Sequence, residues 1–390
     1  MSFLASALRV WLAFRHKYRI LYPMTAHAPP LRYGWTTGSC ATAAAKAAWT
    51  ALKTGQFPDP VIITLPGGKS VSFALTSHGF NENGAWAAVV KDAGDDPDVT
   101  HGALIHAAVR ERPEGSGITF VAGAGVGTVT RPGLPLPPGE PAINPVPRQM
   151  ITRALEDVSG PDVSAEVTVS VENGVALAQK TLNSRLGILG GLSILGTTGI
   201  VVPFSCSAWI DSIHRGMDVA RALNLPHLAA TTGNVSERAV QALYGLPETA
   251  LIEMGDFAGG VLKYIRRHPV PRLTIGGGIA KMTKLAQGRM DLHSKRGSAD
   301  MPALAALATA AGAGADLAEA IAVAPTVAEA FLLAFRAEIP LGDHIAQAAR
   351  QFSLSVLEGS DVVLDVLVFD RQGQCVGRSH PMGNPPLKRL

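Results

Sequence analysis

The segment RLTIGGGIAKMTKLAQG (residues 272–288) decides the fold class that we predict. In it, an apolar, strand-like run ends in three consecutive glycines and passes directly into a helical pattern. The same order recurs where HLAATTG (227–233) leads into NVSERAVQALYG and where ALIEMGDF (250–257) leads into AGGVLKYIRRH. Strands that alternate with helices are typical of parallel sheets with crossover connections. The second half of the chain is therefore predicted to be a Rossmann-like α/β domain.

The first half has a different pattern, in which β-rich runs follow one another closely. VIITLPGGKSVSFAL (61–75) predicts a hairpin, AWAAVV (85–90) a buried strand, and AEVTVSVENGVALAQ (165–179) a second hairpin that turns at residues 172–174. A helix is expected over 39–54, ended by Gly55, and another from about Pro97. We therefore predict an α+β N-terminal domain with antiparallel strands, within an α/β protein overall.

At 390 residues the chain is too long for one ordinary core, so we expect more than one domain. We place an α+β domain at residues 31–195 and the Rossmann-like domain at 196–390, divided at the glycine-rich stretch GILGGLSILGTTGI (187–200). Residues 1–30 form an extension that is either disordered or due to an upstream start codon, with Met24 as the true beginning. The extension is too short and too charged to span a bilayer, and the alternative is a basic amphipathic helix on a membrane surface.

The composition excludes several classes of protein. Hydrophobic residues make up 47% and charged residues 17%, as in a folded protein with a large core, and the net charge is only +3. Basic residues form no stripe with interleaved aromatics, so we expect neither a nucleic-acid nor a membrane partner. The three cysteines, Cys40, Cys206 and Cys375, share no metal-ligand spacing and are odd in number. We therefore expect no metal site, no disulfide framework and a reducing, cytoplasmic location.

The alanine-rich helix at 39–54 begins behind a loop that contains no acidic residue. The first 58 residues contain no Asp or Glu and seven Lys or Arg, so the positive end of the helix dipole is not neutralised. Ser39 could cap the helix while Thr36, Thr37 and the Gly38 amide face an anion. The alternative is a capped helix behind a tight turn.

An acidic loop, KDAGDDPD (91–98), has the opposite character. Asp96-Pro97 is a good helix start, with Asp at the N-cap and Pro at the first helical position. That role leaves Asp92 and Asp95 unexplained, and they are candidates for a general base or for contact with a cationic or hydroxyl-bearing ligand. The alternative is a solvated capping loop.

Several further loops are candidates for ligand contact. Gly276–Gly278 follow a strand directly, which lets backbone approach a nucleoside-type ligand at the carboxyl edge of an open sheet. The alternative is merely a tight turn from strand to helix. The Thr-Thr-Gly triplet of residues 36–38 recurs at 197–199 and 231–233, which indicates small polar ligands or merely tight turns. The basic loop RMDLHSKRG (289–297) carries His293 and Lys295 and favours an acidic substrate, or is simply a solvated basic loop.

Six segments taken together resemble the CbiD family, the cobalt-precorrin-5B C1-methyltransferases of cobalamin biosynthesis. They occur in order along the chain: LRYGWTTGSCATAAAKAA (31–48), VVKDAGDDPDVTHGALI (89–105), INPVPRQMI (143–151), TLNSRLGILGGLSILGTTGIV (181–201), TTGNVSERAV (231–240) and GGGIAKMTKLAQGRMDLHS (276–294). The resemblance covers nearly everything from about residue 30 onward. It implies S-adenosylmethionine as methyl donor and a cobalt-corrinoid tetrapyrrole as acceptor, with cobalt-precorrin-6A as product. It is also compatible with a homo-oligomer or with transient contacts to other enzymes of that pathway.

Direct displacement at a sulfonium depends on positioning, and an acidic macrocycle calls for basic groups. As catalytic residues we expect Asp92 and Asp95. As substrate-binding residues we expect Arg32, Thr36, Thr37, Ser39, Arg148, Arg185, His293 and Lys295, with Lys281 as a further cation. As donor-binding residues we expect Thr197, Thr198, Thr232, Gly276, Gly277 and Gly278.

Two other classes of function stay open at this point. One is a non-catalytic protein that binds or channels corrinoids. The other is a small-molecule kinase-like enzyme with a glycine-rich phosphate loop, although the chain carries no Walker motif.

Overall fold

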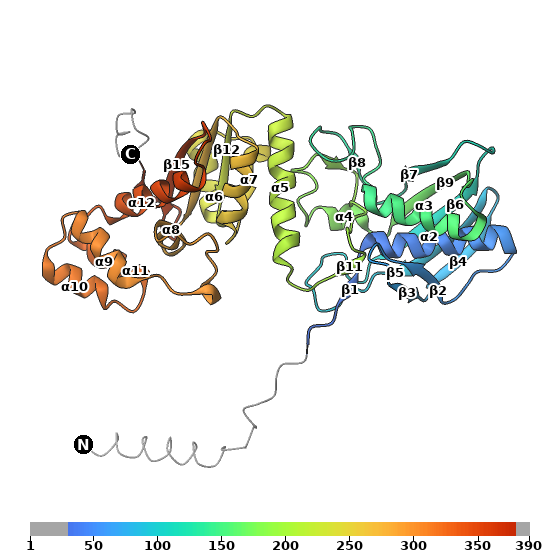
Figure 1. Cartoon of the computed structure of the whole chain (residues 1–390), viewed down its shortest axis with the longest axis horizontal. Helices are drawn as coiled ribbons and strands as arrows, with labels where there is room; N and C mark the ends of the chain where they lie inside the picture. The colour runs from blue at the N-terminus through green and yellow to red at the C-terminus, as the bar shows by residue number, and fades with distance from the viewer. Residues whose placement is uncertain (1–29, 380–390) are drawn as a thin grey trace, which may run out of the picture. The chain divides into compact units, whose positions relative to one another are not determined.

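The computed structural model describes residues 30–379, and the extension predicted at residues 1–30 lies almost entirely outside this range. Residues from Tyr33 onward belong to one compact unit. That unit contains two five-stranded sheets, each with its own main hydrophobic core. Both sheets and the helices beside them can be followed in Figure 1. In the sequence, the strands of the first sheet come before the glycine-rich stretch 187–200 and those of the second come after it. The division into domains at that stretch stays a prediction.

The first sheet is mostly antiparallel, as predicted for this half of the chain. Each pair of neighbouring strands is antiparallel except β7 with β9, which are parallel. In spatial order the strands are β4 (Ser77–Asn81), β5 (Gly84–Val90), β6 (Leu104–Glu111), β9 (Ala165–Val171) and β7 (Ile118–Ala122). The predicted hairpin is confirmed, since β2 (Val61–Thr64) and β3 (Ser70–Phe73) pair antiparallel. Two small pairs accompany them, β1 (Gly34–Trp35) with β11 (Ile200–Val201) and β8 (Thr128–Val129) with β10 (Ile188–Leu189).

The alanine-rich segment forms α2 (Thr37–Thr54), which packs against β5, β6 and α3 (Pro145–Ser159). Nearly every residue from Thr37 to Ala51 is buried, so the helix is enclosed on all sides and not only along one stripe. Small side chains allow this close enclosure, because interiors are packed at high density. Burial raises the pKa of the Cys40 thiol to about 12, so Cys40 is a protonated core residue.

The second sheet has the order β13-β12-β14-β15-β16. Its first four strands are parallel and the last is antiparallel to β15. The strands are β12 (His227–Thr231), β13 (Leu251–Glu253), β14 (Arg272–Gly278), β15 (Val363–Phe369) and β16 (Cys375–Arg378). Together the two sheets confirm the predicted α/β class, with antiparallel strands in the first half and parallel strands in the second.

Helices cover both faces of the second sheet. Val240 of α6 (Asn234–Tyr244) packs in one cluster with Ala229 and Leu367, while the alternate strand residues Leu228 and Val366 belong to the larger core on the opposite face. That larger core contains residues of α5 (Cys206–Ala222), α7 (Ala258–Arg267), α8 (Ile279–Ala286), α9 (Met301–Ala310), α10 (Ala315–Ala322), α11 (Val327–Arg336) and α12 (Leu341–Val356). Over residues 30–379, no helix combines the length and apolarity needed to cross a membrane.

The connections of this sheet reverse direction between β12 and β14. From β12 the chain passes through α6 to β13 on one side, and from β13 it returns through α7 to β14 on the other side of β12. The helices that follow β12 and β14 therefore lie on opposite faces. In open α/β sheets such a switch point leaves a crevice outside the carboxyl ends of the two strands, where ligands bind.

Two local predictions are wrong. The predicted hairpin at 172–174 does not form, because Asn173 is left-handed (φ 55°) and the short helix α4 (Gly174–Ala178) follows β9. No helix starts at Pro97, since residues 91–103 form a loop in which the Gly94 and Thr100 amides donate to the carboxylates of Asp92 and Asp98.

The packing of α12 on β16 depends on the absence of a side chain at Gly342. A Cβ there would lie 1.9 Å from the carbonyl oxygen of Val376. We expect Gly342→Ala to lower the free energy of unfolding by about 3 kcal/mol, because two backbones must separate. At Gly260 in α7 a Cβ would find its nearest neighbours at 3.4 Å or more. Gly260→Ala should leave stability unchanged or raise it by up to about 1 kcal/mol. Urea denaturation measures both, and equal effects would contradict the packing argument.

Candidate functional site

The carboxyl edge of the second sheet brings Thr232 and the three glycines together. The Thr232 amide, directly after β12, donates to the Gly276 carbonyl of β14 at 3.0 Å. A Cβ on Gly277 would lie 2.8 Å from the Thr232 side chain, and one on Gly276 would lie 2.9 Å from Val240 Cγ2. A Cβ on Gly278 would meet nothing within 4 Å. Gly276 and Gly277 therefore allow close packing, whereas Gly278 borders open space at the switch point.

Lys281, in the first turn of α8, connects the loops at the carboxyl edge of the second sheet. Its Nζ donates to the Thr232 carbonyl at 3.1 Å and pairs with Asp256 Oδ1 at 3.1 Å. Asp256 follows β13, so the three loops after β12, β13 and β14 are tied at one point. Thr231 Oγ1 is buried beside them and has no hydrogen-bond partner among the described residues. A buried hydroxyl of this kind is uncommon and marks a place where a ligand group or water can bind.

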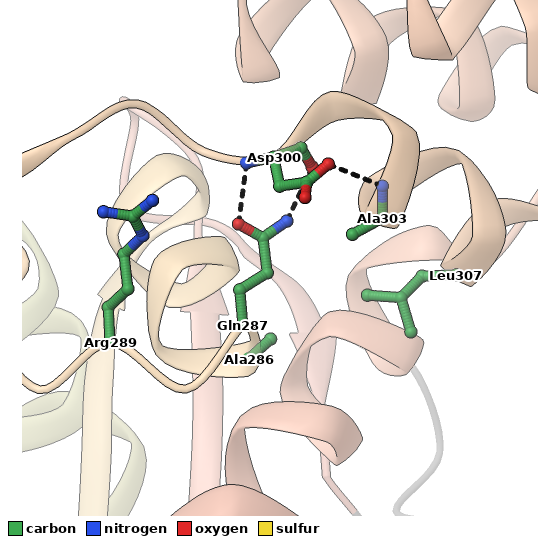
Figure 2. Close-up of a pocket in the computed structure, with 6 residues that line it drawn as sticks. All are labelled: Ala286, Gln287, Arg289, Asp300, Ala303 and Leu307. Carbon is green, nitrogen blue, oxygen red and sulfur yellow. Dashed lines mark hydrogen bonds between the residues drawn. The ribbon is translucent and has the colours of Figure 1, made fainter.

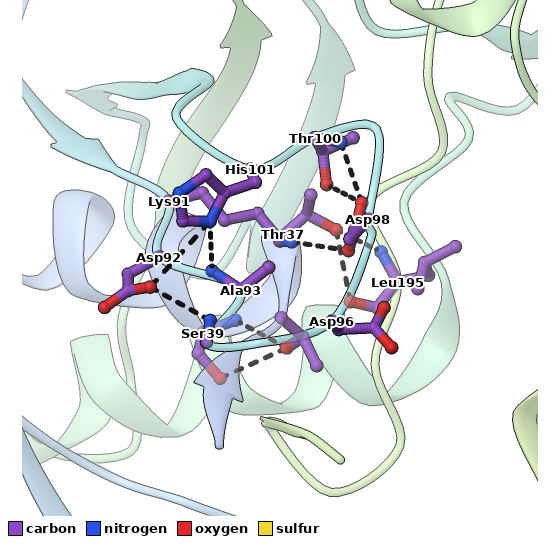
Figure 3. Close-up of polar contacts among 12 residues, drawn as sticks. Thr37, Ser39, Lys91, Asp92, Ala93, Asp96, Asp98, Thr100, His101 and Leu195 are labelled. Atoms are coloured by element: carbon purple, nitrogen blue, oxygen red, sulfur yellow. Dashed lines mark hydrogen bonds and ion pairs between the residues drawn. The ribbon is translucent and has the colours of Figure 1, made fainter. Parts of the chain in front are cut away.

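The start of α2 holds the loop that follows β10 (Figure 3). Thr37 Oγ1 donates to the Leu195 carbonyl at 3.2 Å and accepts from the Leu195 amide at 2.9 Å. Ser39 Oγ donates to the Gly199 carbonyl at 2.7 Å, and the Gly38 amide donates to Leu195. The N-cap is Thr36, whose Oγ1 accepts from the Ser39 amide, so the expectation that Ser39 caps the helix is wrong. The buried Thr37 and Ser39 hydroxyls thus bind the backbone at Leu195 and Gly199. Thr197 and Thr198 lie between these two points and are exposed.

A buried ion pair organises the acidic loop beside it. Lys91, at 1% exposure, bonds Asp98 Oδ2 at 2.6 Å, and Asp98 Oδ1 accepts from the Thr100 amide and hydroxyl (Figure 3). Burial is the largest single effect on the pKa of Asp98 and raises it. The Lys91 charge and three hydrogen bonds together outweigh burial and lower the pKa of that carboxyl.

The other acids of the loop have distinct surroundings. Asp92 Oδ1 accepts from the Gly94 amide at 2.9 Å and lies 3.8 Å from His101 Nδ1, which itself accepts from the Ala93 amide (Figure 3). Asp95 is exposed. The expectation that Asp96 caps a helix is wrong, because its Oδ1 accepts from the Phe204 amide at 2.8 Å. Asp92 and Asp95 thus lie on one loop, and their catalytic role stays a prediction.

Two of the predicted cations, Arg148 and Arg185, already bind carboxylates of the chain. Arg148 bonds Glu140 at 2.8 Å and two backbone carbonyls, and Arg185 makes two bonds to Glu237 in the first turn of α6 at 3.0 and 2.7 Å. His293 accepts from the Lys295 amide on an exposed turn, and Arg32 is exposed near the start of the described chain. Arg148 and Arg185 therefore each form an ion pair within the chain, and both pairs contribute to the structure before any substrate binds.

A pocket lies where α8 ends and α9 begins (Figure 2). Gln287 and the backbone of Asp300 bond each other reciprocally at 2.7 and 2.9 Å, and Asp300 Oδ1 caps α9 through the Ala303 amide. Arg289 lines the pocket, but His293 and Lys295 of the same basic loop do not. The sequence carried no signal for Gln287 or Asp300, since their pairing depends on how the loop folds back.

Known proteins are similar to this chain over most of its length. The family model CbiD matches residues 24–203, and the model of the CbiD C-terminal domain matches residues 291–380. The chain belongs to the CbiD family. Three CbiD-family relatives carry the name cobalt-precorrin-5B C(1)-methyltransferase. That of Agrobacterium fabrum is 61% identical over 90% of this chain and 93% of its own. That of Bradyrhizobium sp. is 59% identical over 92% and 96%, and that of Halorhodospira halophila 56% identical over 90% and 94%.

A crystal structure of the cobalamin biosynthesis protein (cbiD) from Archaeoglobus fulgidus is also similar. It is 30% identical and covers 68% of this chain and 83% of its own, with a TM-score of 0.38.

Reasoning from sequence missed Lys91 in this CbiD-family chain. The available signal was its place directly after the buried strand β5, where a lysine must find a partner within the protein.

We expect Asp98→Asn to lower the free energy of unfolding by about 3 kcal/mol, because it leaves the Lys91 charge buried and unpaired. Asp211→Asn, which removes an exposed pair with Arg215, should cost less than about 0.5 kcal/mol. Chemical denaturation at pH 7 compares them; similar losses would rule out a special role for the buried pair.

The same pair predicts how stability depends on pH. The pKa of Asp98 is lower in the folded chain than its unfolded value of about 3.9. Its contribution is therefore complete above about pH 4 and is lost as the pH falls through the folded pKa. The stability difference between the wild type and Asp98→Asn should be constant from pH 5 to 7 and shrink below about pH 4. Urea titrations across this range measure it, and a difference that grows on acidification would contradict the assignment.

Proposed function

We propose that the chain is an S-adenosylmethionine-dependent methyltransferase that methylates C1 of cobalt-precorrin-5B, giving cobalt-precorrin-6A in cobalamin biosynthesis, in the cytoplasm. Relatives with that enzyme name are 56–61% identical over about nine-tenths of the chain. The observation that carries the proposal within the structure is the meeting of Thr232 with Gly276–Gly278 at a topological switch point.

The donor is proposed to bind at this edge. Gly278 leaves room for close approach of a nucleoside. The buried Thr231 hydroxyl has no hydrogen-bond partner among the described residues, and a polar group of the ligand is proposed to be that partner. The Asp256 carboxylate, held by Lys281, is proposed to face the cationic sulfonium of the donor. When bound, the sulfonium supplies an electrophilic methyl group. The residues of the edge then fix its direction, so that positioning provides much of the rate.

The acceptor is proposed to bind over the loop that carries Thr197 and Thr198, which precedes the second sheet in the sequence. Thr36, Thr37 and Ser39 act indirectly, by holding the loop that carries Thr197 and Thr198. The guanidiniums of Arg148 and Arg185 already bind carboxylates of the chain, so His293 and Lys295 are proposed to contact the carboxylates of the macrocycle. The role of Arg32 in substrate binding stays a prediction. Asp92 or Asp95 is proposed to accept a proton if one is released when the carbon is methylated.

The proposal is tested by incubating the purified chain with labelled S-adenosylmethionine and cobalt-precorrin-5B. Mass spectrometry should show one added methyl group, and NMR should place it on C1. Tetrapyrrole binding without methyl transfer would instead identify a non-catalytic corrinoid-binding protein.

Gly278 offers a test of the donor site that does not disturb packing. Gly278 (φ −67°, ψ 154°) and Gly314 (φ −69°, ψ 167°) are both N-cap glycines with no neighbour within 4 Å of a Cβ. We expect Gly278→Ala to weaken S-adenosylmethionine binding about tenfold, since a methyl group would enter the crevice, a loss of about 1.4 kcal/mol. Gly314→Ala should bind normally. Calorimetry measures both affinities and melting curves confirm folding; equal affinities would place the donor elsewhere.

A further inference from the structure

Two large aromatic side chains are exposed in the segment that enters α5. Phe204 is 65% exposed and Trp209 is 48% exposed, although aromatic residues make up only 6% of the chain. Three more apolar residues shortly before them in the chain are also exposed, namely Leu189, Leu195 and Val202. Phe204 and Trp209 are five positions apart in the sequence, and a surface formed by neighbouring exposed apolar side chains marks a binding site.

Phe204 is held in an unfavourable backbone conformation. Its φ is 56°, in the left-handed region that a bulky residue rarely adopts. Its amide donates to Asp96 Oδ1 at 2.8 Å, so the acidic loop fixes the residue in this conformation. Strained backbone persists where the surroundings enforce it, and it concentrates at functional sites.

Trp209 lies beside the carboxyl edge of the second sheet. It is one turn before Ile213, on the same helical face as the buried Ile213 and Met217, so it continues the core-facing stripe of α5 beyond the core. A Cβ on Gly255 would lie 3.6 Å from Trp209 Nε1. Gly255 directly precedes Asp256, which pairs with Lys281. The indole is therefore next to the loop that borders the proposed donor site.

A purely structural role leaves most of this surface unexplained. With Ser205 as N-cap, Phe204 and Trp209 occupy the N′ and N4 positions of α5, where apolar pairs pack as a hydrophobic staple. A staple serves to bury its two side chains against each other. Here about half or more of each side chain remains accessible.

We propose that Phe204 and Trp209 form an aromatic platform that binds the flat conjugated face of the tetrapyrrole acceptor. This inference rests on the function proposed above. The acceptor carbon must lie in line with the transferred methyl group, so the surface that holds the macrocycle must adjoin the donor edge. Aromatic side chains bind flat π-systems by stacking, and the carboxylates at the rim of the ring then remain accessible to cations.

The test is the double variant Phe204→Ala/Trp209→Ala. Alanine has the same difficulty as phenylalanine at positive φ, so the change removes the ring and keeps the backbone preference. The Kd for cobalt-precorrin-5B, measured by equilibrium dialysis, should rise about tenfold or more. The Kd for S-adenosylmethionine should stay within about twofold of the wild type, because the platform does not hold the donor. The conservative variant Phe204→Tyr/Trp209→Phe should bind the tetrapyrrole nearly normally.

Phe335→Ala is the matched control, since Phe335 in α11 is also 65% exposed, and it should bind like the wild type. An unchanged tetrapyrrole Kd in the folded double variant would overturn the platform. So would a variant that changes only self-association in sedimentation, because the rings would then contact a second copy of the chain. A wild-type chain that neither binds nor methylates the tetrapyrrole would instead refute the proposed function itself.

Discussion

The close approach of β12 and β14 at their carboxyl ends constrains the candidate site more than any other contact. The Thr232 amide reaches the Gly276 carbonyl, and the Thr232 side chain fills the space that a Cβ on Gly277 would need. Two glycines are therefore required for packing before any ligand is considered. Only Gly278, the last of the three, borders open space, and the donor proposal depends on this asymmetry.

Contacts between distant parts of the sequence hold the second element of the site. The hydroxyls of Thr37 and Ser39 bind backbone at Leu195 and Gly199, some 160 residues later. The sequence suggested that the positive helix end would face an anion. In the structure the Gly38 amide donates to the Leu195 carbonyl and the Ser39 amide donates to the Thr36 hydroxyl. The first 58 residues contain no Asp or Glu, yet the acidic loop lies beside this helix end, because the Trp35 amide donates to the Asp92 carbonyl and the Asp92 charge acts on the Cys40 thiol.

The sequence predicted the fold well wherever hydrophobic patterns were long. The alternation around residues 227–288 identified the parallel sheet, and the edge formed by Thr232 and Gly276–Gly278 followed from it. Local motifs were less reliable. Asp96-Pro97 had the chemistry of a helix start, yet Asp96 binds the Phe204 amide, which lies 108 residues away. The pairings Lys91–Asp98 and Arg185–Glu237 were also missed, since which charges meet depends on tertiary structure.

The enclosure of α2 has a consequence for the reactivity of the chain. Cys40 lies at zero exposure within this helix, while Cys206 and Cys375 are exposed. A thiol attacks electrophiles only as the thiolate, so Cys40 can react only when the first sheet releases the helix. The slow alkylation of one cysteine out of three therefore reports how often the interior of the first sheet opens, without any introduced label.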